Sequence, residues 1–217
     1  MPTNKKVLVS KSMNLIIKLI ILPVLFMCLL SACATSPPQN TTDICRIFSD
    51  KSSWYKKANK ASKRWGSSIP AMMAIMHQES RFKAKARPPR STFLWVFPGP
   101  RPSNSYGYSQ AKVSTWSWYQ KSANRSGADR DDFGDAIDFI GWYNSVTNKK
   151  NRVPLSDTYN LYLAYHEGHG GHARGTYNNK AWLKSVAKKV SNRAVSYRQQ
   201  LQQCESRLKK SSRFWLF

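Results

Sequence analysis

The chain has 217 residues, and its 35 lysines and arginines outnumber its 11 acidic residues, which gives a formal net charge of +24. Such a charge implies an anionic partner, and the candidate classes are peptide carboxylates, lipid headgroups and nucleic acid. No nucleotide, flavin or metal motif is present in the sequence, so we expect no cofactor.

Residues 1–32 are expected to be a targeting segment rather than part of the fold. They contain four lysines, no acidic residue and an apolar run from Leu15 to Leu30, and Leu-Ser-Ala-Cys then ends at Cys33. This tetrapeptide resembles a bacterial lipobox, in which the signal is cleaved before the cysteine and the cysteine thiol is lipidated. The alternative is an uncleaved anchor, but a membrane span needs about 20 apolar residues and this run is interrupted by Lys18.

Cleavage before Cys33 leaves a chain whose charge is 31 minus 11, or +20. Ala34 follows the cysteine, whereas an aspartate there tends to retain such lipoproteins at the inner membrane. We therefore expect a lipid anchor in the outer membrane, facing the periplasm of a Gram-negative bacterium. Export argues against nucleic acid as the partner. Residues 33–42 are polar and Pro-containing and predict a flexible tether, and residues 43–217 predict one monomeric domain.

The cysteines support an oxidising compartment. Cys28 leaves with the signal and Cys33 takes the lipid, so Cys45 and Cys204 are the two that remain. In an oxidising periplasm they predict a disulfide. Such a bond closes nearly the whole domain, and in the chain-entropy model it stabilises the fold by about 4–5 kcal/mol. Two unrelated thiols are the alternative.

The body reads as helical, with one long Pro-rich loop from Arg87 to Arg101, RPPRSTFLWVFPGPR. Phe93, Trp95 and Phe97 on this loop either stack against sugar rings or anchor the loop in the core. Apolar residues recur at helical spacing elsewhere. The helices expected are residues 43–64, residues 71–79 with Ser68 as cap, one starting near Gln110, residues 129–150, one capped by Ser156 and Asp157 that runs through Leu161 and Ala164, and a last one over residues 183–204.

Glu79 is the candidate catalytic residue. Glycoside cleavage needs a carboxyl group that stays protonated near neutral pH, and apolar surroundings raise a carboxyl pKa. Glu79 ends the most apolar predicted helix, AMMAIMHQE. Pairing with Arg81 or Lys83 is the alternative role for this carboxylate.

Three segments carry a resemblance to a known family. HQESRFKAKA around Glu79 resembles the glutamate-serine motif of lytic transglycosylases of the soluble-transglycosylase superfamily. SYGYSQA, residues 105–111, resembles the family's Gly-Leu-Met-Gln segment, and LAYHEGHGG, residues 163–171, resembles its Ala-Tyr-Asn-Ala-Gly segment. The resemblance covers roughly residues 65–197. It departs from the family at Tyr108, Ser109, His166 and Glu167 and in the longer Pro-rich loop.

The resemblance implies a mainly α, lysozyme-like single domain of the goose type, with a long Pro-rich loop. It implies cleavage of peptidoglycan glycan strands between N-acetylmuramic acid and N-acetylglucosamine, with Glu79 as general acid and base and a 1,6-anhydro product. The substrate-binding residues that it implies are Ser80, Gly107, Tyr108, Ser109, Gln110, Tyr165, His166, Glu167 and Tyr197.

Two other activities and a metal site stay open as alternatives. His166, His169 and His172 flank Glu167, but the zinc-protease pattern needs histidines four apart, and the glycines argue against a helix there, so we expect a glycine-rich turn and no metal. Glu167 across the cleft from Glu79 would make a muramidase, a hydrolase. A basic lipoprotein that only binds peptidoglycan is the third reading, and it predicts salt-sensitive binding.

Overall fold

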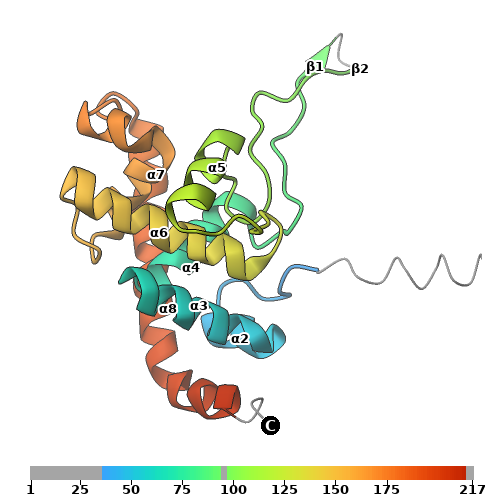
Figure 1. Ribbon diagram of the computed structural model, residues 1–217, viewed down its shortest axis with the longest axis vertical. Coiled ribbons are helices and arrows are strands. Elements are labelled where there is room, and N and C mark those ends of the chain that lie inside the picture. The colour runs from blue at the N-terminus through green and yellow to red at the C-terminus, as the bar shows by residue number, and fades with distance from the viewer. Residues whose placement is uncertain (1–35, 94–96, 214–217) are drawn as a thin grey trace, which may run out of the picture. The chain divides into compact units, whose positions relative to one another are not determined.

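The computed structural model describes residues 36–93 and 97–213. For residues 92–93, 97–98 and 211–213 it describes the backbone alone. The chain divides into two units, Met1–Ser36 and Pro37–Phe217, and the fold described here is that of the second. The expected signal peptide and Cys33 lie outside the described residues. Within those residues the elements are α2 (Ile44–Asp50), α3 (Ser52–Trp65), α4 (Ile69–Ser80), β1 (Thr92–Phe93), β2 (Phe97–Pro98), α5 (Val113–Ser122), α6 (Phe133–Asn151), α7 (Thr158–Ala173) and α8 (Ala181–Arg213) (Figure 1).

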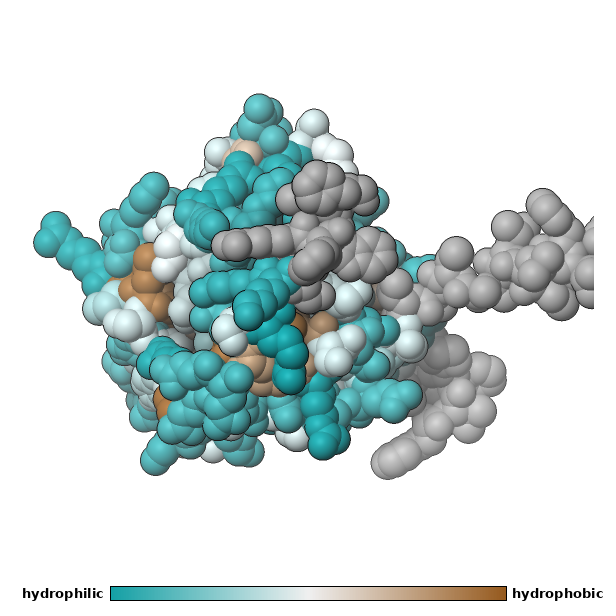
Figure 2. Space-filling view, turned by 90° about the horizontal axis from the view of Figure 1, so that it is seen from below, coloured by the Kyte–Doolittle hydropathy of each residue, from teal (hydrophilic) through white to brown (hydrophobic). Residues whose placement is uncertain are grey.

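The domain is mainly helical, as predicted. The long helix α8 supports α2, α4 and α7, while α6 packs against α3, α4 and α7. Trp54 of α3 stacks on Phe133 of α6 with ring centroids 3.8 Å apart, and this contact joins the first half of the chain to the second. The face in Figure 2 is largely hydrophilic, with only small apolar patches. No helix in the described part of the chain is apolar over a length that would cross a membrane.

Helix α4 is the most deeply buried element. The Ser68 hydroxyl caps it by accepting from the Ala71 N–H, and Pro70 stands in the first turn, where proline is tolerated. Every residue from Ile69 to Met76 is buried. The helix ends at Arg81 and Phe82, two residues with φ of 50° and 61°. Residues other than glycine rarely adopt this backbone conformation. The fully buried Phe82 ring anchors the sharp turn that follows Glu79.

Several predicted boundaries were wrong. The helix expected over residues 43–64 is interrupted at Lys51, whose φ of −120° and ψ of 72° separate α2 from α3. The helix expected from near Gln110 begins at Val113, because Gln110 itself has a φ of 50°. The helix expected from Asp129 begins at Phe133, since Asp132 acts as its N-cap by accepting from the Asp135 N–H.

The glycine-rich segment after Glu167 is helical, contrary to expectation. Helix α7 continues to Ala173, with a single break at Gly168, where φ is 76° and ψ is 160°. The non-helical conformation of Gly168 redirects α7. Glycine can adopt this positive φ because it has no side chain. The remaining glycines follow the break and stay within the helix.

The disulfide prediction is confirmed. Cys45 of α2 and Cys204 of α8 are bonded, 159 positions apart in sequence. The Gln200 amide on α8 reinforces this junction, because its oxygen accepts from the Ile44 N–H and its nitrogen donates to the Thr42 carbonyl. The Tyr197 hydroxyl donates to the Thr41 carbonyl. Residues 41–42, expected to belong to the tether, are therefore bonded to α8.

The Pro-rich loop contains a short antiparallel hairpin that extends away from the helices (Figure 1). Thr92 pairs with Pro98 and Phe93 with Phe97. The side chains of Phe93, Trp95 and Phe97 lie outside the described residues, so their role in sugar stacking or loop anchoring stays a prediction.

Candidate active site

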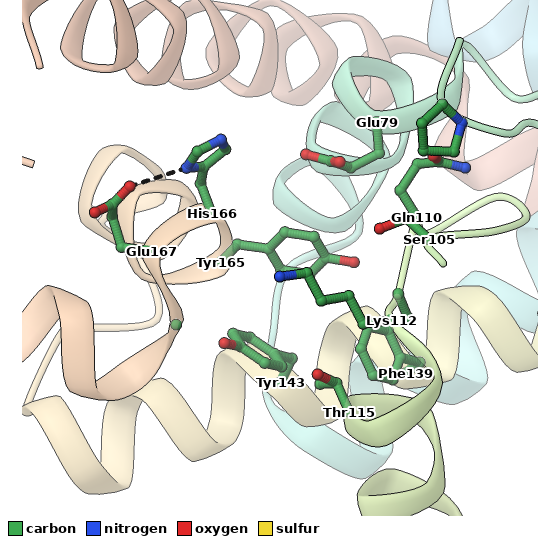
Figure 3. A pocket seen from close by; sticks show the side chains of 13 residues that line it. Glu79, Ser105, Gln110, Lys112, Thr115, Phe139, Tyr143, Tyr165, His166 and Glu167 are labelled. Atoms are coloured by element: carbon green, nitrogen blue, oxygen red, sulfur yellow. Dashed lines mark hydrogen bonds and ion pairs between the residues drawn. The ribbon is translucent and has the colours of Figure 1, made fainter. Parts of the chain in front are cut away.

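Glu79 lines a cavity of about 470 Å³ formed by α4, α5, α6, α7 and the segments before α5 (Figure 3). Its carboxyl group comes from the last turn of α4, immediately before the turn at Arg81. The cavity thus brings residues from most of the chain to one carboxyl. The lining residues are Glu79, Pro88, Ser105, Gln110, Ala111, Lys112, Thr115, Phe139, Tyr143, Tyr165, His166, Glu167 and Gly168.

The surroundings of Glu79 favour its protonated form. Burial raises the pKa of its carboxyl from the ordinary 4.5 to about 7, and a hydrogen bond with Tyr162 acts in the opposite direction. The side chain still reaches the cavity, since the residue is only half-buried. A carboxyl with a pKa near 7 is suited both to donate and to accept a proton at neutral pH.

Aromatic side chains from α6 and α7 line the cavity that contains Glu79. The Tyr165 hydroxyl donates to the Ser109 carbonyl over 2.6 Å, which ties α7 to the segment before α5. Its ring meets that of Tyr143 edge-on, with centroids 5.1 Å apart, and that of Phe139 at 6.3 Å. Burial raises the pKa of the Tyr165 hydroxyl, so this group stays a hydrogen-bond donor at neutral pH.

The segment SYGYSQA forms a tight loop that presents Gln110 to the cavity. The Gly107 N–H donates to the Ala86 carbonyl, and the Gln110 side-chain nitrogen donates to the carbonyls of Ala86 and Gly107 at 2.9 and 2.8 Å. Gly107 has a φ of 79°, and a Cβ there would lie 2.0 Å from the Arg130 carbonyl oxygen. Only glycine fits this close approach, so the loop depends on it.

Five residues expected to bind substrate do not line this cavity. The Ser80 hydroxyl donates to the Met76 carbonyl, and Tyr108 is buried against Trp54 and Phe133. The Ser109 side chain is fully buried, and only its carbonyl takes part, as the acceptor of Tyr165. The other two, Gly107 and Tyr197, use their polar groups within the protein, in the loop above and at Thr41. None of the five is among the residues that line the cavity.

Glu167 lines the cavity, but its carboxylate is occupied. The Lys180 ammonium donates to both carboxylate oxygens at 2.8 Å, the Thr176 hydroxyl donates to one of them, and His166 Nδ1 lies 3.1 Å from the other. The Lys180 bond, followed by the Thr176 bond, lowers the pKa of Glu167 to about 2. A carboxylate held in this way stays ionised at neutral pH and is a poor proton donor.

The three histidines around Glu167 point to different neighbours. His169 stacks on Tyr143 with centroids 4.3 Å apart and approaches the Thr147 hydroxyl, His172 stacks on Tyr177, and His166 packs against Trp182. In the part of the chain that the structure describes, no three His, Cys, Asp or Glu side chains gather in a way that would hold a metal ion.

Sequence reasoning missed several residues of the site. Tyr162 contacts Glu79 directly, and its spacing of three from Tyr165 on one helix was the available signal. Tyr143 of α6 also lines the cavity. Ser105, Lys112 and Thr115 also line the cavity, and their place within or just after SYGYSQA was the available signal.

Comparison with known proteins identifies one family. The sequence profile of the family described as Transglycosylase SLT domain matches residues 21–204, which is most of the chain. No curated protein and no solved structure gives a match.

Proposed function

Because the chain belongs to the transglycosylase SLT domain family, which implies peptidoglycan as the substrate, we propose that it is a lytic transglycosylase with Glu79 as its general acid and base. The observation that carries this proposal is a carboxyl group with a pKa of about 7 in a cavity large enough for sugar rings. Glycoside cleavage needs such a carboxyl to protonate the leaving oxygen.

The proposed reaction uses Glu79 twice. Its protonated form donates to the glycosidic oxygen between N-acetylmuramic acid and N-acetylglucosamine, and that C–O bond breaks. Its carboxylate then takes the proton of the muramoyl 6-hydroxyl as this oxygen bonds to C1 and closes the 1,6-anhydro ring. No water is consumed. The substrate's acetamido group stabilises the positive charge that develops at C1, so a second carboxylate is not required.

Three neighbouring groups support this role. The Tyr162 hydroxyl hydrogen-bonds to Glu79, and Tyr165 and Gln110 line the same cavity. We propose that Tyr165 lines the sugar site and that Gln110 holds the sugar from the opposite segment. The basic character of the chain suits the acidic stem peptides of peptidoglycan, since it carries 35 basic and 11 acidic residues.

We also propose that the protein acts at the periplasmic side of the outer membrane as a monomer, with residues 1–32 as signal and the lipid on Cys33. The bonds of Thr41 and Thr42 to α8 restrict any free tether to the residues before them. Growth in labelled palmitate tests the anchor, because Cys33→Ala should lose the label and Cys28→Ala should keep it.

The activity is tested by digesting purified sacculi with the full chain in detergent, wild type beside Glu79→Gln, and weighing the products by mass spectrometry. We expect anhydro-muropeptides, one water lighter than hydrolysis products, and their loss with Glu79→Gln. Reducing-end muropeptides would move the assignment to a muramidase that uses Glu79 and Glu167. Salt-sensitive binding by both proteins without any release would leave a non-catalytic peptidoglycan-binding lipoprotein.

A further inference from the structure

An exposed tryptophan continues one wall of the cavity. Trp182, in the first turn of α8, is 57% exposed, the largest value among the exposed large apolar residues of the described chain. Its ring meets the His166 ring edge-on, with centroids 5.2 Å apart and an interplanar angle of 79°. His166 itself lines the cavity that contains Glu79. The two rings therefore extend the cavity wall beyond its last lining residue.

The carboxylate of Glu167 holds this wall in place. It binds Lys180 through both oxygens, at 2.8 Å each, and contacts His166 at 3.1 Å. Lys180 stands two residues before Trp182, so the ion pair connects the end of the first part of α7 to the start of α8. The Glu167 side chain is only 5% exposed, whereas those of Lys180 and His166 are 39% and 38% exposed.

The break at Gly168 makes this arrangement possible. With a φ of 76° at Gly168, α7 changes direction directly after Glu167, and the segment 174–180 brings the chain back beside it. In Figure 3 the Glu167 carboxylate turns toward His166, while the Glu79 carboxyl lies across the cavity from both. The Glu167 carboxylate is thus placed to order the wall and not to act together with Glu79 on one glycosidic bond.

A tryptophan ring in water is unfavourable unless it has a partner, because its large apolar surface stays hydrated. A flat aromatic face suits the apolar C–H face of a pyranose ring, and a neighbouring imidazole suits the sugar hydroxyls. The glycan strand that passes Glu79 would reach this wall next, since the cavity leads to it through His166.

We propose that Trp182 and His166 form an additional saccharide-binding subsite, which stacks one N-acetylhexosamine ring of the glycan strand and is held by the Glu167–Lys180 ion pair. This inference rests on the proposed function. It gives a role in strand binding to His166 and Glu167, two of the positions where the chain departs from the family pattern.

The test measures binding by isothermal titration calorimetry with the full chain in detergent, in a Glu79→Gln background where no cleavage occurs. The ligands are β-1,4-linked N-acetylglucosamine oligomers of three and six sugars. We expect the hexamer to bind more tightly than the trimer. Trp182→Ala should weaken hexamer binding by about tenfold, the effect of losing one stacked ring, and leave trimer binding within about twofold. Trp182→Phe should restore most of the affinity.

Val195→Ala is the matched control, because Val195 is an exposed apolar residue further along α8, and it should bind both ligands as the parent does. Equal affinity of parent and Trp182→Ala for the hexamer would overturn the subsite, as would equal loss for both oligomers together with a lower melting temperature. Failure of the proposed function is separate: it shows as the absence of anhydro products from sacculi treated with the chain that retains Glu79.

Discussion

The hydroxyl of Tyr162, on α7, hydrogen-bonds to the carboxyl of Glu79, at the end of α4. Burial, followed by the nearby Glu79 charge, raises the pKa of Tyr162, so its hydroxyl stays protonated and acts as a donor. The bond stabilises the ionised form of Glu79 and lowers its pKa, against the larger effect of burial. Two opposing effects therefore set the pKa of Glu79. Burial raises it, and the hydrogen bond from Tyr162, which one substitution can remove, lowers it.

Tyr162→Phe should move the alkaline limb of the pH–rate profile upward. Loss of the hydrogen bond disfavours the carboxylate further, so the Glu79 pKa should rise above 7 by about one unit. Activity on soluble glycan strands, followed as kcat/KM from pH 5 to pH 10, reports this limb. Tyr55→Phe is the control, because it removes a tyrosine–glutamate hydrogen bond to Glu205, outside the cavity lining. A limb that stays in place in Tyr162→Phe would contradict this account of the acid.

Glu79→Gln should stabilise the fold at alkaline pH. The folded-state pKa of about 7 lies above the ordinary 4.5, so between these values the folded protein binds more protons at Glu79 than the unfolded chain does. The stabilisation that this proton gives the wild type is therefore fully present below pH 4.5 and is lost as pH rises through 7. Relative to the wild type, the free energy of unfolding of the variant, measured in urea, should be about 1–3 kcal/mol higher at pH 8.5 than at pH 4.5. An identical difference at both pH values would contradict the raised pKa.

Local signals in the sequence sufficed for α4 and the disulfide. Ser68 and an apolar run predicted the buried helix and the place of its carboxyl, since capping and burial act over a few neighbouring residues. Cys45 and Cys204 were the two cysteines left after processing, and their pairing needed no coordinates.

Tertiary contacts determined what the sequence did not reveal. The break at Lys51 occurs within a continuous amphipathic pattern that contains no proline or glycine to mark it. The positive φ of Arg81 and Phe82 likewise has no glycine signal, because it depends on burial of the Phe82 ring. Gly107 and Ser109 were read as sugar contacts, whereas the Gly107 N–H donates to the Ala86 carbonyl and the Ser109 carbonyl accepts from the Tyr165 hydroxyl, which is far away in sequence. The partner of Glu167 was also not predictable from its neighbours in sequence, because Lys180 lies on a different segment.

Gly107→Ala should destabilise the loop that presents Gln110. The added Cβ would meet the Arg130 carbonyl at 2.0 Å, and the φ of 79° disfavours any L side chain. We expect a loss of about 2–4 kcal/mol in urea unfolding and a fall in activity at temperatures where the protein stays folded. Gly127→Ala is the matched control, since nothing lies within 4 Å of its added Cβ, and it should change stability by less than about 0.5 kcal/mol. Equal stability of both variants would mean that the loop accommodates a side chain at Gly107.

Glu167→Gln distinguishes two roles for Glu167: the structural ion pair with Lys180 and a second catalytic carboxylate. Because both Glu167 oxygens bind the Lys180 ammonium, the amide should weaken the α7–α8 junction and raise KM for long strands severalfold, while kcat changes by less than about threefold. The products should remain anhydro-muropeptides.

Lys180→Gln removes the same ion pair from its other side, so it should reproduce the KM effect of Glu167→Gln. The double variant should then lose no more than either single variant, because the two residues act as one unit. A hydrolase that uses Glu167 as its base or nucleophile would behave differently: Glu167→Gln would lower kcat by several orders of magnitude, Lys180→Gln would leave most of it, and the products would carry reducing ends.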